Sequence, residues 1–127
     1  MNGFTATIKE ASKDLTARER IAIKDTGACI SLDEITTTEG HITIEYAYHV
    51  VLAIHNERSD NKDYEKIITV DRDGTRYITG SNSYYEALTD IVTEMTEAGE
   101  GDNIVLDVYR MESKNYKGKS FITVSLK

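Results

Sequence analysis

The chain of 127 residues contains one cysteine, Cys29, and no proline. A lone cysteine excludes an intramolecular disulfide and a zinc site built from several thiolates. We expect Cys29 to be a small buried apolar residue in a strand over residues 28–31, because free cysteines are frequently buried. Internal repeats and low-complexity segments are also absent, which argues against a repeat architecture.

Long apolar runs are missing as well. No segment approaches the roughly 20 apolar residues that a membrane-spanning helix needs, and the N-terminus MNGFTATIKEASKD lacks the charged and then apolar layout of a secretory signal. Hydrophobic residues make up 39% and charged residues 29% of the chain, which is typical of a folded soluble protein. We therefore expect a cytoplasmic protein with one domain over residues 1–127 and no membrane contact.

Residue combinations typical of catalysis or metal binding are not found. His41, His49 and His55 fall on one side of a predicted strand, too far apart to share a metal ion, so we interpret them as solvated. The segment TVDRDG (residues 69–74) resembles the start of a calcium loop, but Gly80 stands where an acidic residue must close it. We expect neither enzymatic activity nor a cofactor.

Alternation of apolar and polar residues dominates the chain and predicts strands. Residues 41–55 are the longest alternating run and predict one long, bent, half-buried strand. Tyr46 and Tyr48 fall on its apolar side and are expected in the core. Residues 22–31 predict two short extended pieces around the turn sequence Asp-Thr-Gly.

Two hairpins and one helix complete the predicted order. An Asp-Gly turn joins strands over residues 66–70 and 75–79, and a final hairpin pairs residues 104–109 with 119–126. Between the hairpins, helical spacing of apolar residues predicts a helix over residues 83–98, begun by the capping box Ser-Tyr-Tyr-Glu and ended by Gly99. The fold class predicted is mostly β: a five-stranded barrel of the oligonucleotide-binding type, with one helix before the final hairpin.

Positive charge gathers at the C-terminus. Residues 105–127 carry five Lys or Arg against two acids, whereas residues 1–103 carry ten against twenty. In the final hairpin the alternation turns Tyr109 and Phe121 outward, and the cations and ring near them are Arg110, Lys114, Tyr116, Lys117 and Lys119. Interleaved rings and cations are typical of proteins that bind single-stranded nucleic acid. Alternatively, Tyr109 and Phe121 form a cross-strand pair or pack under the loop.

The Asp-Gly hairpin offers a second basic and aromatic point. Arg72 and Arg76 flank the turn, and Tyr77 faces outward if Ile78 lies in the core. The alternative is that both arginines pair with the neighbouring aspartates of the turn.

The ending SKNYKGKSFITVSLK resembles that of the small single-stranded DNA-binding proteins of protein-primed phages infecting Gram-positive bacteria, with related copies in other phages and mobile elements. EGHITIEYAY and DRDGTRYITGSNSYYEALTDIV resemble earlier segments of the same family, so the resemblance covers roughly residues 28–127. It implies an oligonucleotide-binding barrel that coats displaced single strands without sequence preference. The residues it implicates are Tyr77, Lys117, Lys119 and Phe121, and it gives the first 27 residues no role.

We therefore expect sequence-independent binding and protection of single-stranded DNA during replication or recombination of a phage or mobile element, in the cytoplasm of a bacterial host. Replication or recombination proteins are further candidate partners. Two alternatives stay open. One is an acidic protein-interaction module or anti-host DNA mimic, which would need its acids in a row along one face; the other is an RNA-binding version of the same barrel.

Overall fold

The computed structural model describes residues 4–113 and 118–127. Strands make up 44% and helices 28% of them, so the prediction of a mostly-β fold is confirmed. The strands are β1 (Phe4–Ala11), β2 (Ile30–Ser31), β3 (Ile42–Asn56), β4 (Asp63–Asp71), β5 (Arg76–Thr79), β6 (Val105–Glu112) and β7 (Ser120–Leu126). The helices are α1 (Ala17–Ile23), a 3-10 turn η1 (Thr26–Ala28), α2 (Leu32–Glu39) and α3 (Asn82–Glu97).

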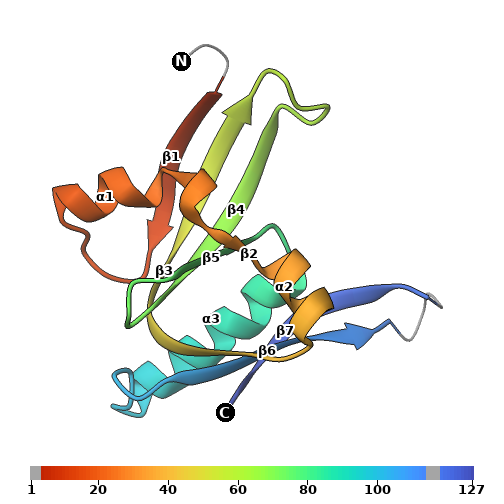
Figure 1. Cartoon of the computed structure of the whole chain (residues 1–127). Helices are drawn as coiled ribbons and strands as arrows, with labels where there is room; N and C mark the ends of the chain where they lie inside the picture. The colour runs from red at the N-terminus through yellow and green to blue at the C-terminus, as the bar shows by residue number, and fades with distance from the viewer. Residues whose placement is uncertain (1–3, 114–117) are drawn as a thin grey trace.

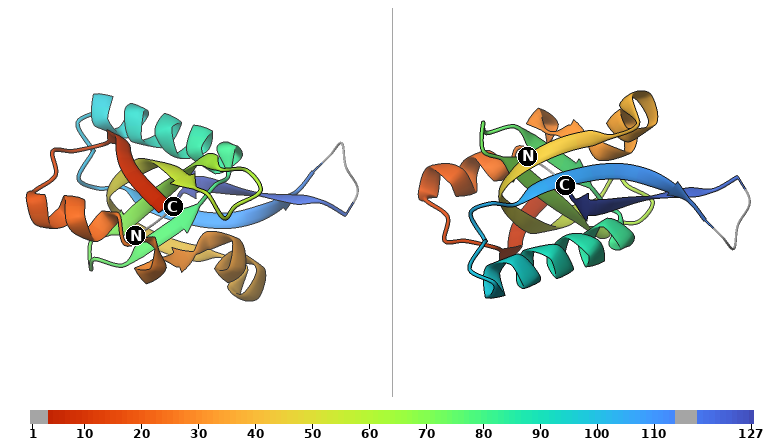
Figure 2. Two further views of the ribbon diagram at one scale, coloured as in Figure 1. Left: turned by 90° about the horizontal axis from the view of Figure 1, so that it is seen from above. Right: turned by 90° about the horizontal axis from the view of Figure 1, so that it is seen from below.

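The strands form one curled sheet in the order β2-β5-β4-β3-β6-β7, and β1 pairs with β3. β3 belongs to both halves of the curl, since its residues 42–45 pair with β6 and its residues 46–55 pair with β4. We call β1, β2, β4, β5 and the second part of β3 the first sheet, and β6, β7 and the first part of β3 the second sheet (Figure 1). Helices α3 and α2 lie on opposite sides of the curl (Figure 2).

A β-bulge at Ala47 divides the long strand. Tyr46 is opposite Asp71 and Tyr48 is opposite Val70, so β3 advances two residues while β4 advances one. Such an extra residue exchanges the two faces of a strand. The prediction of a single apolar side over residues 41–55 is therefore wrong: the even-numbered residues face one core before the bulge and a different core after it.

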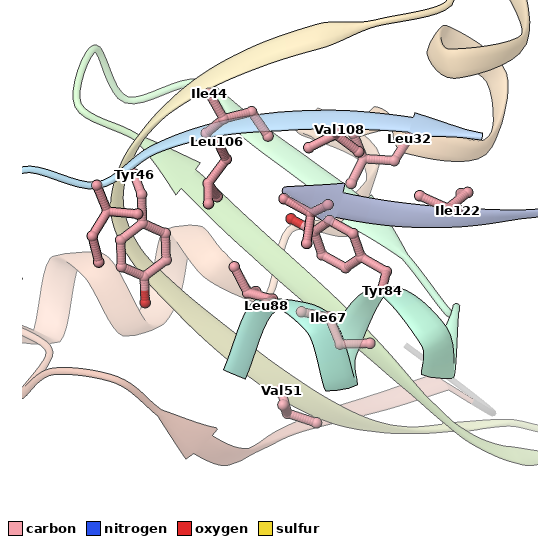
Figure 3. Packing of buried hydrophobic residues seen from close by; sticks show 12 residues of the cluster. Leu32, Ile44, Tyr46, Val51, Ile67, Tyr84, Leu88, Leu106, Val108 and Ile122 are labelled. Carbon is pink, nitrogen blue, oxygen red and sulfur yellow. The ribbon is translucent and has the colours of Figure 1, made fainter. Parts of the chain in front are cut away.

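The inner core fills the space inside the curl. Ile44, Leu106 and Ile122 reach it from the second sheet, and Tyr84 and Leu88 reach it from α3 (Figure 3). Tyr84 is fully buried, and its hydroxyl is hydrogen-bonded at 2.7 Å to Thr69 on the first sheet. This contact joins α3 to the sheet and fixes where the helix closes the curl.

The outer core lies on the opposite face of the first sheet. Tyr48, Val50 and Leu52 point into it after the bulge, and Ile23 covers it from α1 at 1% exposure. Leu15 and Cys29 pack against its margin. Residues 12–23, which we call the N-terminal segment, thus cover this face, while β1 extends the sheet by pairing with β3.

His49 shows the effect of the bulge on one residue. It is 7% exposed and hydrogen-bonded to the Tyr46 hydroxyl at 2.6 Å. Burial lowers its pKa, so the imidazole is kept neutral. The expectation that His49 is solvated is wrong, because the extra residue at Ala47 turns it inward.

The locally encoded elements are confirmed. The Asp-Gly turn joins β4 to β5, with Gly74 at φ +92°, and β6 pairs with β7. Helix α3 begins one residue earlier than predicted. The predicted capping box of Ser83 and Glu86 is wrong: Ser81 caps the helix by accepting a hydrogen bond from the Tyr84 amide, and Ser83 donates to the Ile122 carbonyl.

The expectation of one helix is wrong, and of the extended pieces predicted over residues 22–31 only the strand β2 (Ile30–Ser31) is found. Thr16 and Glu19 form a complete capping box that starts α1. Ser31 caps α2, and three successive threonine hydroxyls donate to the carbonyls of Leu32, Asp33 and Glu34. Cys29 is half-buried beside the two-residue strand β2. Within the described residues, no helix is long and apolar enough to cross a membrane.

Candidate nucleic-acid interface

The outward side of the second sheet is the surface on which the sequence placed its site. Cross-strand pairing puts Asp107, Tyr109 and Met111 of β6 on this side, opposite Ser125, Thr123 and Phe121 of β7. The outward residues of the neighbouring β3 are Thr43 and Glu45. In the view from below, no described helix crosses these strands (Figure 2). We call this surface, with His41 and Lys127 at its border, the open face.

Tyr109 has a fixed position on the open face. Its ring stacks on His41 with centroids 4.8 Å apart and planes 22° from parallel. The Tyr109 hydroxyl is hydrogen-bonded at 2.7 Å to Ser125, and His41 Nδ1 is hydrogen-bonded at 3.0 Å to Asp107. Two strands therefore hold an ordered pair of flat rings whose His41 member is turned to solvent, since its side chain is 67% exposed.

Phe121 is the second ring of the open face. It lies opposite Met111, and the two side chains are 37% and 44% exposed. Tyr109 lies opposite Thr123 and not opposite Phe121, so the two rings sit diagonally on adjacent strands. The result is an apolar and aromatic strip that the described chain leaves in contact with solvent.

Charges on the open face are few and mostly paired. Asp107 is bonded to His41, and Glu45 lies 4.0 Å from the Arg72 guanidinium. Lys127 donates to the Thr43 hydroxyl at 2.6 Å. Lys119 is exposed next to the start of β7, where its carbonyl accepts a bond from the Ser113 amide.

The structure places Arg110 away from the open face. It lies opposite Ile122, in the inward register of β6. Its guanidinium donates to the Asp33 carbonyl at 3.1 Å and to the Ser120 hydroxyl at 3.0 Å. Its Nε is buried without a hydrogen-bond partner among the described residues. Arg110 therefore ties β6 to α2 at one end of the inner core.

Tyr77 also lies apart from the open face. Both sides of β5 are covered, because Tyr77 packs against the inner core and Ile78 against the outer core. Burial, followed by the charges of Asp71 and Asp73, raises the pKa of Tyr77. The ring is half-buried, and it does not join Tyr109 and Phe121.

Arg72 and Arg76 lie on the rim of a groove between α1 and the β4–β5 turn, with a volume of about 530 Å³. Arg72 donates to the Asp102 carbonyl and Arg76 donates to the Ala22 carbonyl. Neither forms the ion pair with the aspartates of the turn that the sequence left open. Lys114, Tyr116 and Lys117, which the sequence also implicated, lie outside the described residues.

Sequence reasoning missed three residues with a place in these surfaces. His41 stacks on Tyr109, and Lys13 and Arg18 line the groove with Arg72 and Arg76. The capping-box pattern from Thr16 to Glu19 is the one signal in the sequence that could have placed Arg18 on a helix. In the part of the chain that the structure describes, no three His, Cys, Asp or Glu side chains are grouped so as to hold a metal ion.

The description of the open face and the groove rests on the structure alone. Comparison of the chain with known protein families, with curated proteins and with solved structures gave no match.

Proposed function

We propose that the chain binds single-stranded DNA without sequence preference, with the strand lying along the open face. The observation that carries the proposal is the solvent-exposed strip formed by Phe121, Met111 and the His41–Tyr109 stack. Every base has a flat face, so such rings bind bases of any kind, at about 1–3 kcal/mol per stacked base. The choice of single-stranded DNA as the ligand rests on the resemblance of the C-terminal sequence to the phage proteins, which coat displaced single strands.

The distribution of charge around the open face also supports this proposal. Lys119 and Lys127 border the rings, and Lys114 and Lys117 precede β7 in the sequence. The two acids of the open face are each beside a cationic or ionisable partner, His41 or Arg72. A net charge of −7 reduces long-range attraction to DNA, but contact depends on the local patch.

We also infer that β3 to β7 form a partly open five-stranded barrel of the oligonucleotide-binding type. Their order, β5-β4-β3-β6-β7, and the position of α3 between β5 and β6 support this inference. In such barrels the second and third strands bind oligonucleotides on their outward face. Those strands correspond to β4 and β5. Their outward face is buried in the outer core beneath α1 and is not available to a ligand, so we propose that the main contact with DNA lies on the second sheet.

The exposed side of α3 favours a second candidate function, an acidic protein-interaction module. Glu86, Asp90 and Glu94 recur every four residues, Glu97 follows, and the helix contains neither Lys nor Arg. Residues at this spacing lie on one side of a helix, so their carboxylates form a row. A DNA mimic would use such a row, whereas a DNA-binding protein keeps it away from the strand.

One titration separates the two functions. Fluorescence polarisation is measured with oligo-dT, oligo-rU and a duplex of matched length at two salt concentrations. The proposal predicts binding of oligo-dT that weakens as salt rises, with a log–log slope of about −0.7 per phosphate contact. Binding restricted to the duplex, or no binding at low salt, would contradict it, and tighter binding of oligo-rU would assign the face to RNA.

A further inference from the structure

The groove beside α1 is lined by four cations from two distant parts of the chain. Lys13 and Arg18 come from the N-terminal segment, and Arg72 and Arg76 come from the β4–β5 turn. Tyr48, Ile23 and Val70 supply an apolar floor. In a chain of net charge −7, this local excess of positive charge requires an explanation.

Local structure fixes the positions of these cations. The capping box of Thr16 and Glu19 starts α1 and places Arg18 in its first turn. Lys13 donates to Glu19 at 2.7 Å and lies 4.4 Å above the centre of the Tyr48 ring. The bond from Arg76 to the Ala22 carbonyl joins α1 to β5. Both walls of the groove are therefore ordered before any ligand arrives.

The two acids of the groove are already occupied. The carboxylate of Asp71 accepts the backbone N–H groups of Glu45 at 2.9 Å and Asp73 at 3.0 Å. Glu19 accepts bonds from Lys13 and from the Thr16 amide, and these bonds lower its pKa. Among the described residues, neither acid forms an ion pair with Arg18, Arg72 or Arg76.

The arginines keep donors to spare. A guanidinium has five N–H donors, and Arg72 and Arg76 each use one of them on a carbonyl. Arg18 has no hydrogen-bond or ion-pair partner among residues 4–113 and 118–127. Guanidinium groups with free donors favour oxyanions of phosphate geometry.

Arg72 connects the groove to the open face. It lines the groove, and it also lies 4.0 Å from Glu45, an outward residue of β3 next to Val105. A strand that leaves the rings of the open face at this end therefore reaches Arg72 first and then the remaining cations.

From this continuity we propose that the groove binds the phosphodiester backbone of the same single strand, so that the N-terminal segment forms a second contact zone. For its ligand this inference rests on the proposed function. An acidic peptide would match the charge of the groove, whereas a single strand of nucleic acid supplies both phosphates for the groove and bases for the aromatic strip.

Arg18→Glu is the sharpest variant, and Arg20→Glu is its matched control. Both residues are exposed on α1, but Arg20 does not line the groove. The two variants change the net charge equally. Glutamate in the first turn of a helix is favourable, so Arg18→Glu should fold as the parent does, which circular dichroism checks.

The first measurement needs no nucleic acid. Amide chemical shifts are followed while sodium tripolyphosphate is added to the full chain. We expect shifts confined to the groove, including Gly74 and Ala22, which are lost in Arg18→Glu and kept in Arg20→Glu. Shifts spread evenly over the surface, or none at the groove, would overturn the phosphate site.

The second measurement compares oligo-dT of about 4 and about 16 nucleotides, the range of site sizes for such barrels. Lengthening should increase affinity in the parent and in Arg20→Glu, and Arg18→Glu should bind the longer oligonucleotide roughly tenfold more weakly. Equal losses in both variants would indicate a general charge effect and overturn the inference.

The outcomes separate the inference from the proposed function. If tripolyphosphate binds the groove but no oligo-dT binds the chain, the proposed function fails and the phosphodiester assignment fails with it. If oligo-dT binds and Arg18→Glu changes nothing, only the groove is refuted. Displacement of tripolyphosphate by polyglutamate but not by oligo-dT would assign the groove to an acidic protein segment.

Discussion

Both sheets carry apolar and aromatic residues on their outward faces, but these residues are buried on the first sheet and exposed on the second. On the first sheet, Tyr48, Val50 and Leu52 point outward after the bulge and are buried because Ile23 and the segment around it cover them. On the second sheet, the outward Phe121 and Met111 stay 37% and 44% exposed. The difference in exposure therefore comes from the segment that covers the first sheet and not from the alternation of residues along the strands.

This comparison shows why ring-bearing strands cannot be assigned a role by alternation alone. Tyr48 and Tyr109 both lie in alternating runs, yet Tyr48 is 9% exposed within a core while Tyr109 belongs to a surface stack. A buried ring contributes to stability through apolar area removed from water. A ring left at the surface is available to a ligand.

The largest effect is expected beneath the open face. Leu88 is fully buried in the inner core, and Leu88→Ala should cost about 2–5 kcal/mol of unfolding free energy, measured by chemical denaturation. Well below the variant's melting temperature its affinity for oligo-dT should equal that of the parent, because α3 supports the sheet without touching the strand. A folded variant that cannot bind would move the site to α3.

Removal of the surface rings should weaken DNA binding and change stability little, the opposite of the effect expected for Leu88→Ala. Tyr109→Ala and Phe121→Ala should each weaken oligo-dT binding by about 1–3 kcal/mol, with Phe121→Ala leaving stability nearly unchanged. Tyr109→Phe is the control, since it keeps the ring and loses only the hydroxyl bond to Ser125. Unchanged affinity in both folded alanine variants would refute stacking.

Salt dependence of oligo-dT binding distinguishes the cations near the open face from those of the first sheet. Changing Lys114, Lys117 and Lys119 to Gln should reduce the steepness of the log–log salt plot by up to about 2, at about 0.7 per contact with a single strand.

The matched control for this experiment changes Lys9, Lys62 and Lys66 of the first sheet and its β3–β4 loop to Gln. The control should keep the parent's slope. If the C-terminal triple variant also keeps that slope, the phosphates lie elsewhere, and Arg72 and Arg76 become the main cations.

The smallest effect concerns two histidines of the first sheet with opposite pKa shifts. Burial lowers the pKa of His49, so its contribution to stability is present above the unfolded value of about 6.5 and is lost as pH falls. Hydrogen bonds to Asp63 and Glu57 raise the pKa of His55, so its contribution is present below about 6.5 and is lost as pH rises through the folded pKa.

Unfolding free energies between about pH 5 and pH 8 test this assignment. His49→Gln should flatten the acidic side of the stability profile, and His55→Gln should flatten its alkaline side. A profile identical to the parent's in either variant would show that the histidine concerned does not change its pKa on folding.

Features encoded by neighbouring residues could be predicted from the sequence. The Asp-Gly turn, the periodicity of α3 and the alternation of β6 and β7 each depend on residues close in the chain, and the structure confirms them. The outward register of Tyr109 and Phe121 follows from the same alternation.

Features set by distant residues could not be predicted. The bulge at Ala47 depends on pairing with β4, and the groove joins α1 to a turn more than fifty residues later. Helix α2 contains three successive threonines, a residue of low helix propensity, and it is held by Ser31 and by packing of Leu32 in the inner core. The sequence predicts Arg110 as a DNA-binding residue because of its charge and its position beside Tyr109. Its hydrogen bond to the Asp33 carbonyl depends on a residue far away in the chain and cannot be predicted from the local pattern.

Binding of a single strand to the open face is tested most directly by amide chemical-shift mapping of the parent chain with oligo-dT. We predict that the largest shifts fall on residues 41–45, 105–112 and 119–126, while α3 and β1 change little. Largest shifts on the acidic side of α3, with the open face unchanged, would contradict it.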